Sequence, residues 1–272
     1  MQPDRLQQVT RNLIALSFAA FGAHQLIYGA FVTRVIGVVP SWIPFKTFWA
    51  DLTGIMLIAA AIAVVLGKRN VAVVLGFACL VATFLTHLPP ALAQPANAGR
   101  WVFFGKGLVI AGCAFTVAGA LGSRIHAISP QAFILYGRCA LGAFMILSGV
   151  LHFLLRQFVA TLFPSWIPWH MFFTLTAGVL LIAGGIGMIV PITARVASLL
   201  SGIMILAWVP LIHIPLALKN LRNPNESVPV FEALAFGCLA LLAYSSDTKT
   251  APSLYFSEDV PEHSHALVSG PK

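Results

Sequence analysis

The stretch from residue 164 to residue 190 reads PSWIPWHMFFTLTAGVLLIAGGIGMIV and decides the class of fold. From residue 170 onward it contains no Asp, Glu, Lys or Arg. About 20 apolar residues in a helix are enough to cross the hydrocarbon core of a bilayer. Backbone polar groups in lipid must bond within their own segment, so a run this long and continuous predicts a transmembrane helix rather than a barrel strand.

Runs of the same kind recur along the whole chain. Hydrophobic residues make up 59% of the sequence and charged residues only 9%, whereas a soluble domain carries about 25% charged residues. Such a chain cannot cover a folded surface with polar groups, so we expect most of that surface to face lipid. The sequence predicts an all-α integral membrane protein with eight transmembrane helices, at 12–32, 46–67, 71–91, 102–121, 133–155, 170–190, 196–217 and 229–245.

The chain also repeats itself. The PSWIP of 164–168 occurs at 40–44, GVLLIA at 178–183 matches GIMLIA at 54–59, and HIP at 213–215 matches HLP at 87–89. Identity over five positions that include a Trp and two Pro indicates duplication. We therefore expect a four-helix unit at 1–125, a second at 126–246 and a polar, flexible tail at 247–272. Because each unit has an even number of spans, the repeats are predicted to be parallel, related by an axis along the membrane normal.

These motifs resemble those of the DoxX-like membrane proteins. The resemblance rests on four spans per unit, a P-x-W-I-P element that opens the second span, and His-x-Pro that closes the third, over about residues 10–246. It implies a four-helix bundle for each unit. For some members it also implies quinone-dependent oxidation with redox partner subunits, as in the small subunits of thiosulfate:quinone oxidoreductase. Many members have no established activity, so the family narrows function poorly.

Charge and cysteine content exclude other classes of function. The formal charge of +8 is spread over short loops, which is typical of a membrane surface and not of a nucleic-acid site. The four cysteines fall inside apolar runs without a Cys-x-x-Cys motif, so we interpret them as buried small hydrophobes. Nine Lys and Arg residues against seven favour the side that holds both termini as the cytoplasmic side of an inner membrane. The opposite side is called the outer face below.

His87 and His213 form the sharpest pair of candidate site residues. Ionisable side chains inside spans are costly and are treated as functional candidates. The proline two residues after each His should bend or end its helix, which holds the imidazole near the outer face. There it would donate to a quinone carbonyl or ligate haem or a metal. The alternative is that each His only bonds the backbone groups that the proline leaves free. We predict that the two imidazoles share one site.

Other ionisable groups fall at similar depths. His24 and His152 lie in the outer third of the first and fifth spans, where a packing role is the alternative to ligand binding. Asp51 lies in the second span. Lys106 and Glu232 occupy equivalent positions of the two units, so they form an ion pair that locks the halves or take part in ligand or proton binding. Pairing of Lys106 with Asp51 is a further alternative.

The sequence thus favours a membrane subunit of a quinone-linked oxidoreductase system. Quinone, or less favourably haem, would bind near the outer face between the repeats. Catalytic residues and metal ligands are not identified by any motif. Two other hypotheses remain open: a non-enzymatic membrane partner or assembly protein, in which the polar cluster is structural, and a small-solute carrier that uses the cleft between the halves.

Overall fold

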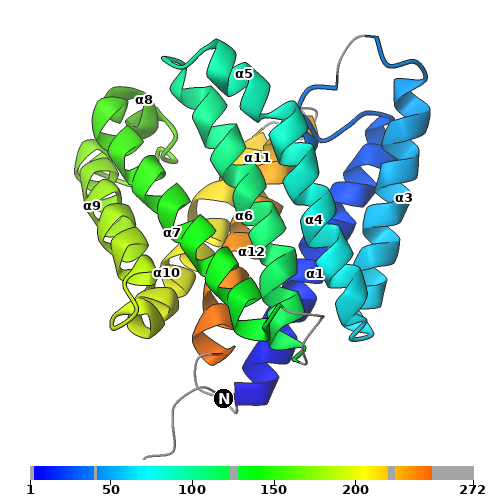
Figure 1. Ribbon diagram of the computed structural model, residues 1–272. Coiled ribbons are helices and arrows are strands. Elements are labelled where there is room, and N and C mark those ends of the chain that lie inside the picture. The colour runs from blue at the N-terminus through cyan, green and yellow to red at the C-terminus, as the bar shows by residue number, and fades with distance from the viewer. Residues whose placement is uncertain (1–2, 40–41, 123–127, 220–223, 247–272) are drawn as a thin grey trace, which may run out of the picture.

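The computed structural model describes residues 3–39, 42–122, 128–219 and 224–246, which form an all-α bundle (Figure 1). The predicted tail at 247–272 lies outside the described residues. In chain order the first half contains α1 (Pro3–Tyr28), α2 (Thr33–Ile36), α3 (Lys46–Val65), α4 (Arg69–Thr86), α5 (Leu88–Ala93) and α6 (Ala98–Ala120). The second half contains α7 (Pro130–Leu154), α8 (Arg156–Thr161), α9 (His170–Ile189), α10 (Ala194–Trp208), a π-helical turn (Val209–His213), α11 (Ile214–Lys219) and α12 (Pro224–Ser246).

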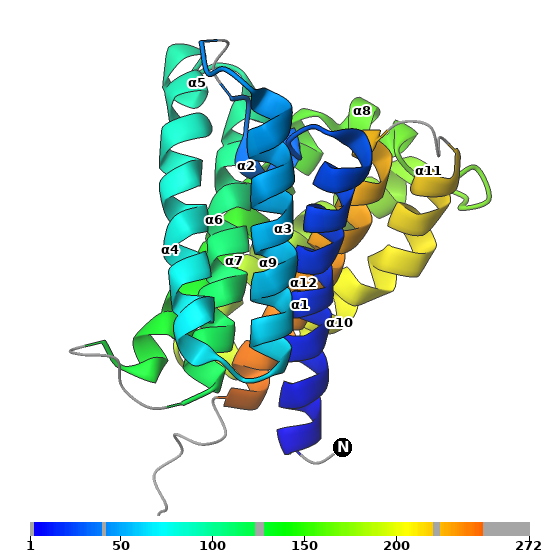
Figure 2. The same cartoon turned by 90° about the vertical axis from the view of Figure 1, so that its right-hand side faces the viewer.

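Seven helical segments of the described residues are long and apolar enough to cross a bilayer, which makes this a multi-pass membrane protein. They are α3, α4 with α5, α6, α7, α9, α10 through α11, and α12. The eighth expected span, α1, is not among them, because polar side chains such as Gln7, Arg11, Asn12 and Gln25 lower its hydropathy. Even so, α1 runs the height of the bundle beside α12 (Figure 2). The Gln7 side-chain amide donates to the Ser245 carbonyl at 2.9 Å, so α1 begins where α12 ends.

Helices α6 and α12 form the centre of the bundle. About two-thirds of each span is buried (67%), against 17–33% for the other five candidate spans. α6 packs against α4, α7 and α12, while α12 packs against α10, α1 and α6. The outer helices turn large apolar side chains outward, among them Ile55, Val74, Val179 and Val196. This distribution is what a lipid solvent favours, because apolar side chains gain nothing by leaving it.

Small residues allow the outer helix pairs to approach closely. A methyl group added to Gly22 of α1 would lie 2.5 Å from the Gly54 carbonyl oxygen of α3. In the other half, one added to Gly149 of α7 would lie 2.7 Å from the Gly178 carbonyl oxygen of α9. The α1–α3 and α7–α9 pairs are therefore joined by the same kind of backbone contact, in which no side chain fits between the helices.

The helix breaks at the two His-x-Pro motifs differ. α4 ends at Thr86, one residue before His87, as the proline pattern predicts. In the second half the α-helix ends earlier, at Trp208, and His213 closes the π-helical turn that follows. Pro210 lies inside this turn and has no N–H to donate, so the regular hydrogen-bond ladder is interrupted there as well.

The glycine contact between α7 and α9 gives a test of the packing. Replacing Gly149 with Leu should lower the free energy of unfolding by roughly 1–3 kcal/mol, because the side chain must push the helices apart. Replacing the neighbouring Val150, which is 40% exposed, with Leu should have little effect. Thermal unfolding of both variants in detergent measures the difference. Equal stability of the two variants would contradict the contact.

Candidate functional site

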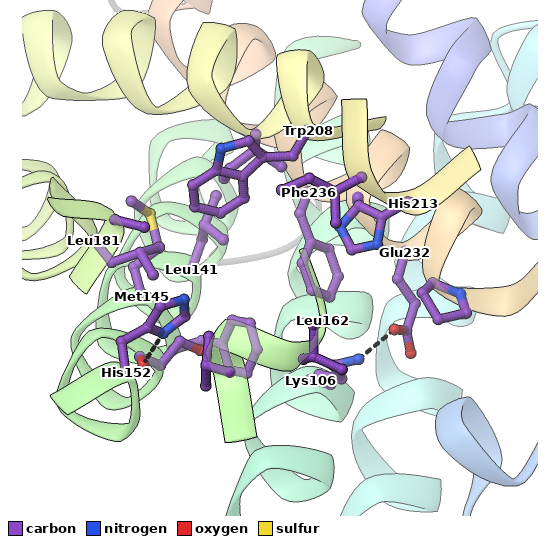
Figure 3. Close-up of a pocket in the computed structure, with 18 of the residues that line it drawn as sticks. Lys106, Leu141, Met145, His152, Leu162, Leu181, Trp208, His213, Glu232 and Phe236 are labelled. Carbon is purple, nitrogen blue, oxygen red and sulfur yellow. Dashed lines mark hydrogen bonds and ion pairs between the residues drawn. The ribbon is translucent and has the colours of Figure 1, made fainter. Parts of the chain in front are cut away.

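An ion pair joins the two central helices. The Lys106 ammonium of α6 contacts the Glu232 carboxylate of α12 (Figure 3). The Glu232 side chain is only 3% exposed and the Lys106 side chain 16% exposed. The predicted ion pair between these residues is confirmed. Asp51, the alternative partner of Lys106, is half-buried on α3 and forms no ion pair among the described residues.

The pair leaves one carboxylate oxygen unused. Oε2 of Glu232 accepts from Lys106, whereas Oε1 is buried and has no hydrogen-bond partner among the described residues. A buried acceptor without a partner loses its hydration without compensation. Glu232 also lines the cavity described next, so Oε1 is available to a bound group.

Beside the ion pair lies a cavity of about 270 Å³ in the second half of the chain. Its walls come from α7, α9, α10, the π-helical turn and α12, with α8 and the loop after it at the rim. The apolar lining includes Leu141, Phe144, Met145, Leu162, Leu181, Trp208 and Phe236. Lys106 is the single contribution of the first half among the lining residues. The cavity therefore lies mostly within one half of the bundle.

Two imidazoles add polarity to this apolar lining. Nδ1 of His152 donates to the Ser148 carbonyl one turn earlier, at 2.7 Å. In the neutral ring this bond leaves Nε2 as an acceptor. His213 lies beside Glu232 in Figure 3 and has no hydrogen bond to any described residue. The cavity thus combines a broad apolar wall with His152, His213 and the Lys106–Glu232 pair.

The structure places His87 in a different cavity. Its Nε2 lies 3.3 Å from the Val35 carbonyl of α2, and its ring stacks on Phe103 at 6.3 Å between centroids. His87 is 6% exposed and lines a smaller space of about 80 Å³ together with Arg100. The two imidazoles line different described cavities, but both lie within electrostatic reach of Glu232, so the shared site that we expected stays a prediction. The surroundings of the two rings differ. The Val35 carbonyl of α2 contacts His87, whereas no hydrogen bond joins His213 to any residue that the structure describes.

The remaining predicted residues lie outside both cavities. His24 packs on Tyr28 of its own helix, with ring centroids 4.6 Å apart. Asp51 lines neither space. Of the seven predicted residues, four therefore meet at the larger cavity: His152, His213, Lys106 and Glu232. Among the described residues no group of three His, Cys, Asp or Glu side chains is arranged to hold a metal ion.

Sequence reasoning missed the apolar part of the site. Met145, Ser148 and Trp208 look like ordinary residues of lipid-embedded helices, and only packing shows that they line a cavity. One signal was present: Pro210 follows Trp208 and precedes the His-x-Pro motif by three residues. Two prolines so close together in a span predict irregular backbone, and in membranes this occurs where the backbone lines a cavity or is covered by protein.

Comparison with known proteins adds one match. Residues 141–242 fit a family model described as a domain of unknown function (DUF8561). This region begins at Leu141 and ends within α12, so it contains most of the cavity lining. No curated protein and no solved structure matches the chain.

The ion pair can be tested with a double-mutant cycle. Replacing either Lys106 or Glu232 with Ala leaves a buried charge without its partner, which should cost about 3–5 kcal/mol of stability. The double replacement should cost less than the sum of the single effects, because neither charge is then left alone. Thermal or chemical unfolding in a fixed detergent measures all four proteins. Strict additivity would show that the two side chains do not interact in the membrane protein.

Proposed function

We propose that this chain is the membrane subunit of a quinone-linked oxidoreductase system and binds the quinone ring in the cavity beside Lys106 and Glu232. The proposal rests on one observation: the cavity wall is mostly apolar but also holds two imidazoles and the Lys106–Glu232 pair. A quinone ring is flat and apolar on its faces and has carbonyl oxygens at its edge. Ligand sites generally pair a mostly apolar lining with a few placed polar groups.

The cavity suits a single ring better than a larger cofactor. Its volume of about 270 Å³ lies near the lower end of the roughly 300–1,000 Å³ typical of ligand pockets. One substituted ring fits, with an isoprenoid chain leaving between the helices toward lipid. A haem needs more room than this volume offers.

The polar groups suit proton exchange with the bound ring. Reduction of a quinone to a quinol takes two electrons and two protons, and the electrons would come from a donor oxidised by a partner subunit. Glu232 Oε1 and His152 Nε2 are groups that can accept or release a proton at the cavity. Lys106 holds the carboxylate in place and neutralises its charge in an apolar surrounding.

The resemblance to DoxX-like proteins and the topology belong to the same proposal. We infer that α1 is the eighth span, since it runs beside α12 over the height of the bundle. The two halves are then parallel four-helix repeats with both termini on the cytoplasmic side. In support, α3 and α9 begin after Phe45 and Trp169, which share the rare left-handed value φ = 53°. A structural partner protein remains the second candidate, since the Lys106–Glu232 pair joins the central helices whether or not a ligand binds.

Quinone binding can be measured directly on the purified protein in nanodiscs. Decylubiquinone should bind saturably, and replacing Ala177 with Leu should weaken binding at least tenfold, because Ala177 lines the cavity on α9. The matched control is Val179→Leu, two residues on and 57% exposed toward lipid, which should bind normally. Absence of saturable binding to the wild-type protein, or equal binding by both variants, would refute the proposed site.

The proposed orientation has its own test. A reporter enzyme that is active only in the cytoplasm, fused after Lys272, should be active, because eight spans return the chain to the side of its N-terminus. A second fusion at the connection between α5 and α6 should be inactive, since that connection lies at the opposite end of the bundle (Figure 1). The reverse pattern would exchange the two faces throughout.

A further inference from the structure

The larger described cavity, of about 270 Å³, lies in the second half of the bundle. At the corresponding place in the first half, no cavity of this size is described. Contacts between helices set the correspondence. Gly54 of α3 lies against Gly22 and against the Cβ of Gln25. Gly178 of α9 lies against Gly149 and against the Cβ of His152. Gln25 of α1 therefore occupies the place that His152 occupies in α7.

Larger side chains fill the corresponding space in the first half. One turn before Gln25 stands Phe21, which is 1% exposed, whereas one turn before His152 stands Ser148, which lines the cavity. Thr53, next to Gly54, donates to the Gln25 side-chain oxygen at 3.1 Å. Its counterpart next to Gly178 is Ala177, which lines the cavity. The second half therefore has the smaller residue at both positions, Ser148 in place of Phe21 and Ala177 in place of Thr53, which leaves open space there.

A short helix completes the filling. α2 packs against α4 and α6, and Val35 within it and Val32 just before it are only 6% and 1% exposed. Its carbonyl groups accept hydrogen bonds from the end of α4 and the residue after it: Ile36 from the Thr86 hydroxyl, and Val35 from His87. The corresponding helix α8 packs against α9 and contains no buried residue (Figure 1). No described backbone carbonyl contacts His213 as the Val35 carbonyl contacts His87.

We infer that the cavity is the open counterpart of a site that α2 fills in the first half, so that each chain binds one ligand. The ligand takes the place of the α2 backbone: its carbonyl oxygen accepts from His213 as the Val35 carbonyl accepts from His87. Apolar groups on either side of that carbonyl take the places of Val32 and Val35. This inference rests on the proposed quinone function for the ligand's identity, but the geometry requires only a carbonyl with apolar flanks.

Two probes separate the carbonyl contact from simple filling of the cavity. Decylubiquinone has ring carbonyls, whereas decyltoluene keeps a ring and a chain without any carbonyl. Equilibrium binding to the wild-type protein in nanodiscs should give one site per chain for decylubiquinone. Replacing His213 with Phe should weaken decylubiquinone roughly three- to tenfold, as expected for one hydrogen bond, and leave decyltoluene unchanged. His213→Gln keeps a donor and should recover part of the loss, while the matched change His87→Gln should alter neither affinity.

Filling the space tests the correspondence between the halves. Ser148→Phe introduces the side chain found at Phe21 and should weaken both probes at least tenfold. Met145→Phe, one turn earlier on α7 and also at the cavity wall, is the second variant if Ser148→Phe unfolds, as judged by thermal unfolding. Two sites per chain, normal binding by these variants, or an equal effect of His213→Phe on both probes would overturn the inference.

The outcomes also distinguish this inference from the proposed function. A decyl-substituted cyclohexenone, which has one carbonyl, serves as a third probe. If it shows the predicted response to His213→Phe and Ser148→Phe while decylubiquinone does not bind, the quinone function fails and the inference stands. If decylubiquinone binds at two sites per chain, or binds without regard to His213, the inference fails and the quinone function stands.

Discussion

Packing around α6 and α12 holds the two halves of the bundle together. These helices are the most buried of the candidate spans, and each also packs against helices of both halves. Lipid tails are as apolar as Leu, so burial of apolar area alone does not hold such helices together. Close packing and the Lys106–Glu232 pair do so instead. A charge left alone at this position would be expensive, so each charge favours the arrangement that supplies its partner.

The same pair lies at the wall of the larger described cavity. Glu232 is held by Lys106 through one oxygen, and its other oxygen remains without a described partner at the wall of a cavity. An apolar space next to a held carboxylate and two imidazoles is suited to a ligand that is mostly apolar and exchanges protons at its edge. A solute that is polar throughout would find few groups to replace its hydration along the Leu, Met and Phe wall.

The two halves show how related packing yields different outcomes. Glycine contacts fix the helix pairs α1–α3 and α7–α9 at similar separations, so the space beside them depends on a few side chains. In one half the counterpart positions hold Phe21 and Thr53, and Val32 and Val35 are buried there as well. Ser148 and Ala177 leave that space open in the other. Protein interiors are close-packed, so a change of this size at neighbouring positions is enough to create or remove a site.

The class of fold follows from the amino-acid sequence alone, because apolar runs of bilayer length leave the backbone no alternative to helices. The predicted runs agree with the described helices to within a few residues at most ends, apart from α1, which starts earlier at Pro3 and has too many polar side chains to meet the hydropathy of a span. The pairing of Lys106 with Glu232 could also be anticipated, since equal depth and opposite charge bring such groups together. The different surroundings of His87 and His213 depend on tertiary packing: the motifs around them are alike, but the Val35 carbonyl of α2 bonds to His87, whereas His213 lines a cavity that α8 borders. That difference depends on side-chain volumes on neighbouring helices, which a pattern along one chain segment does not contain.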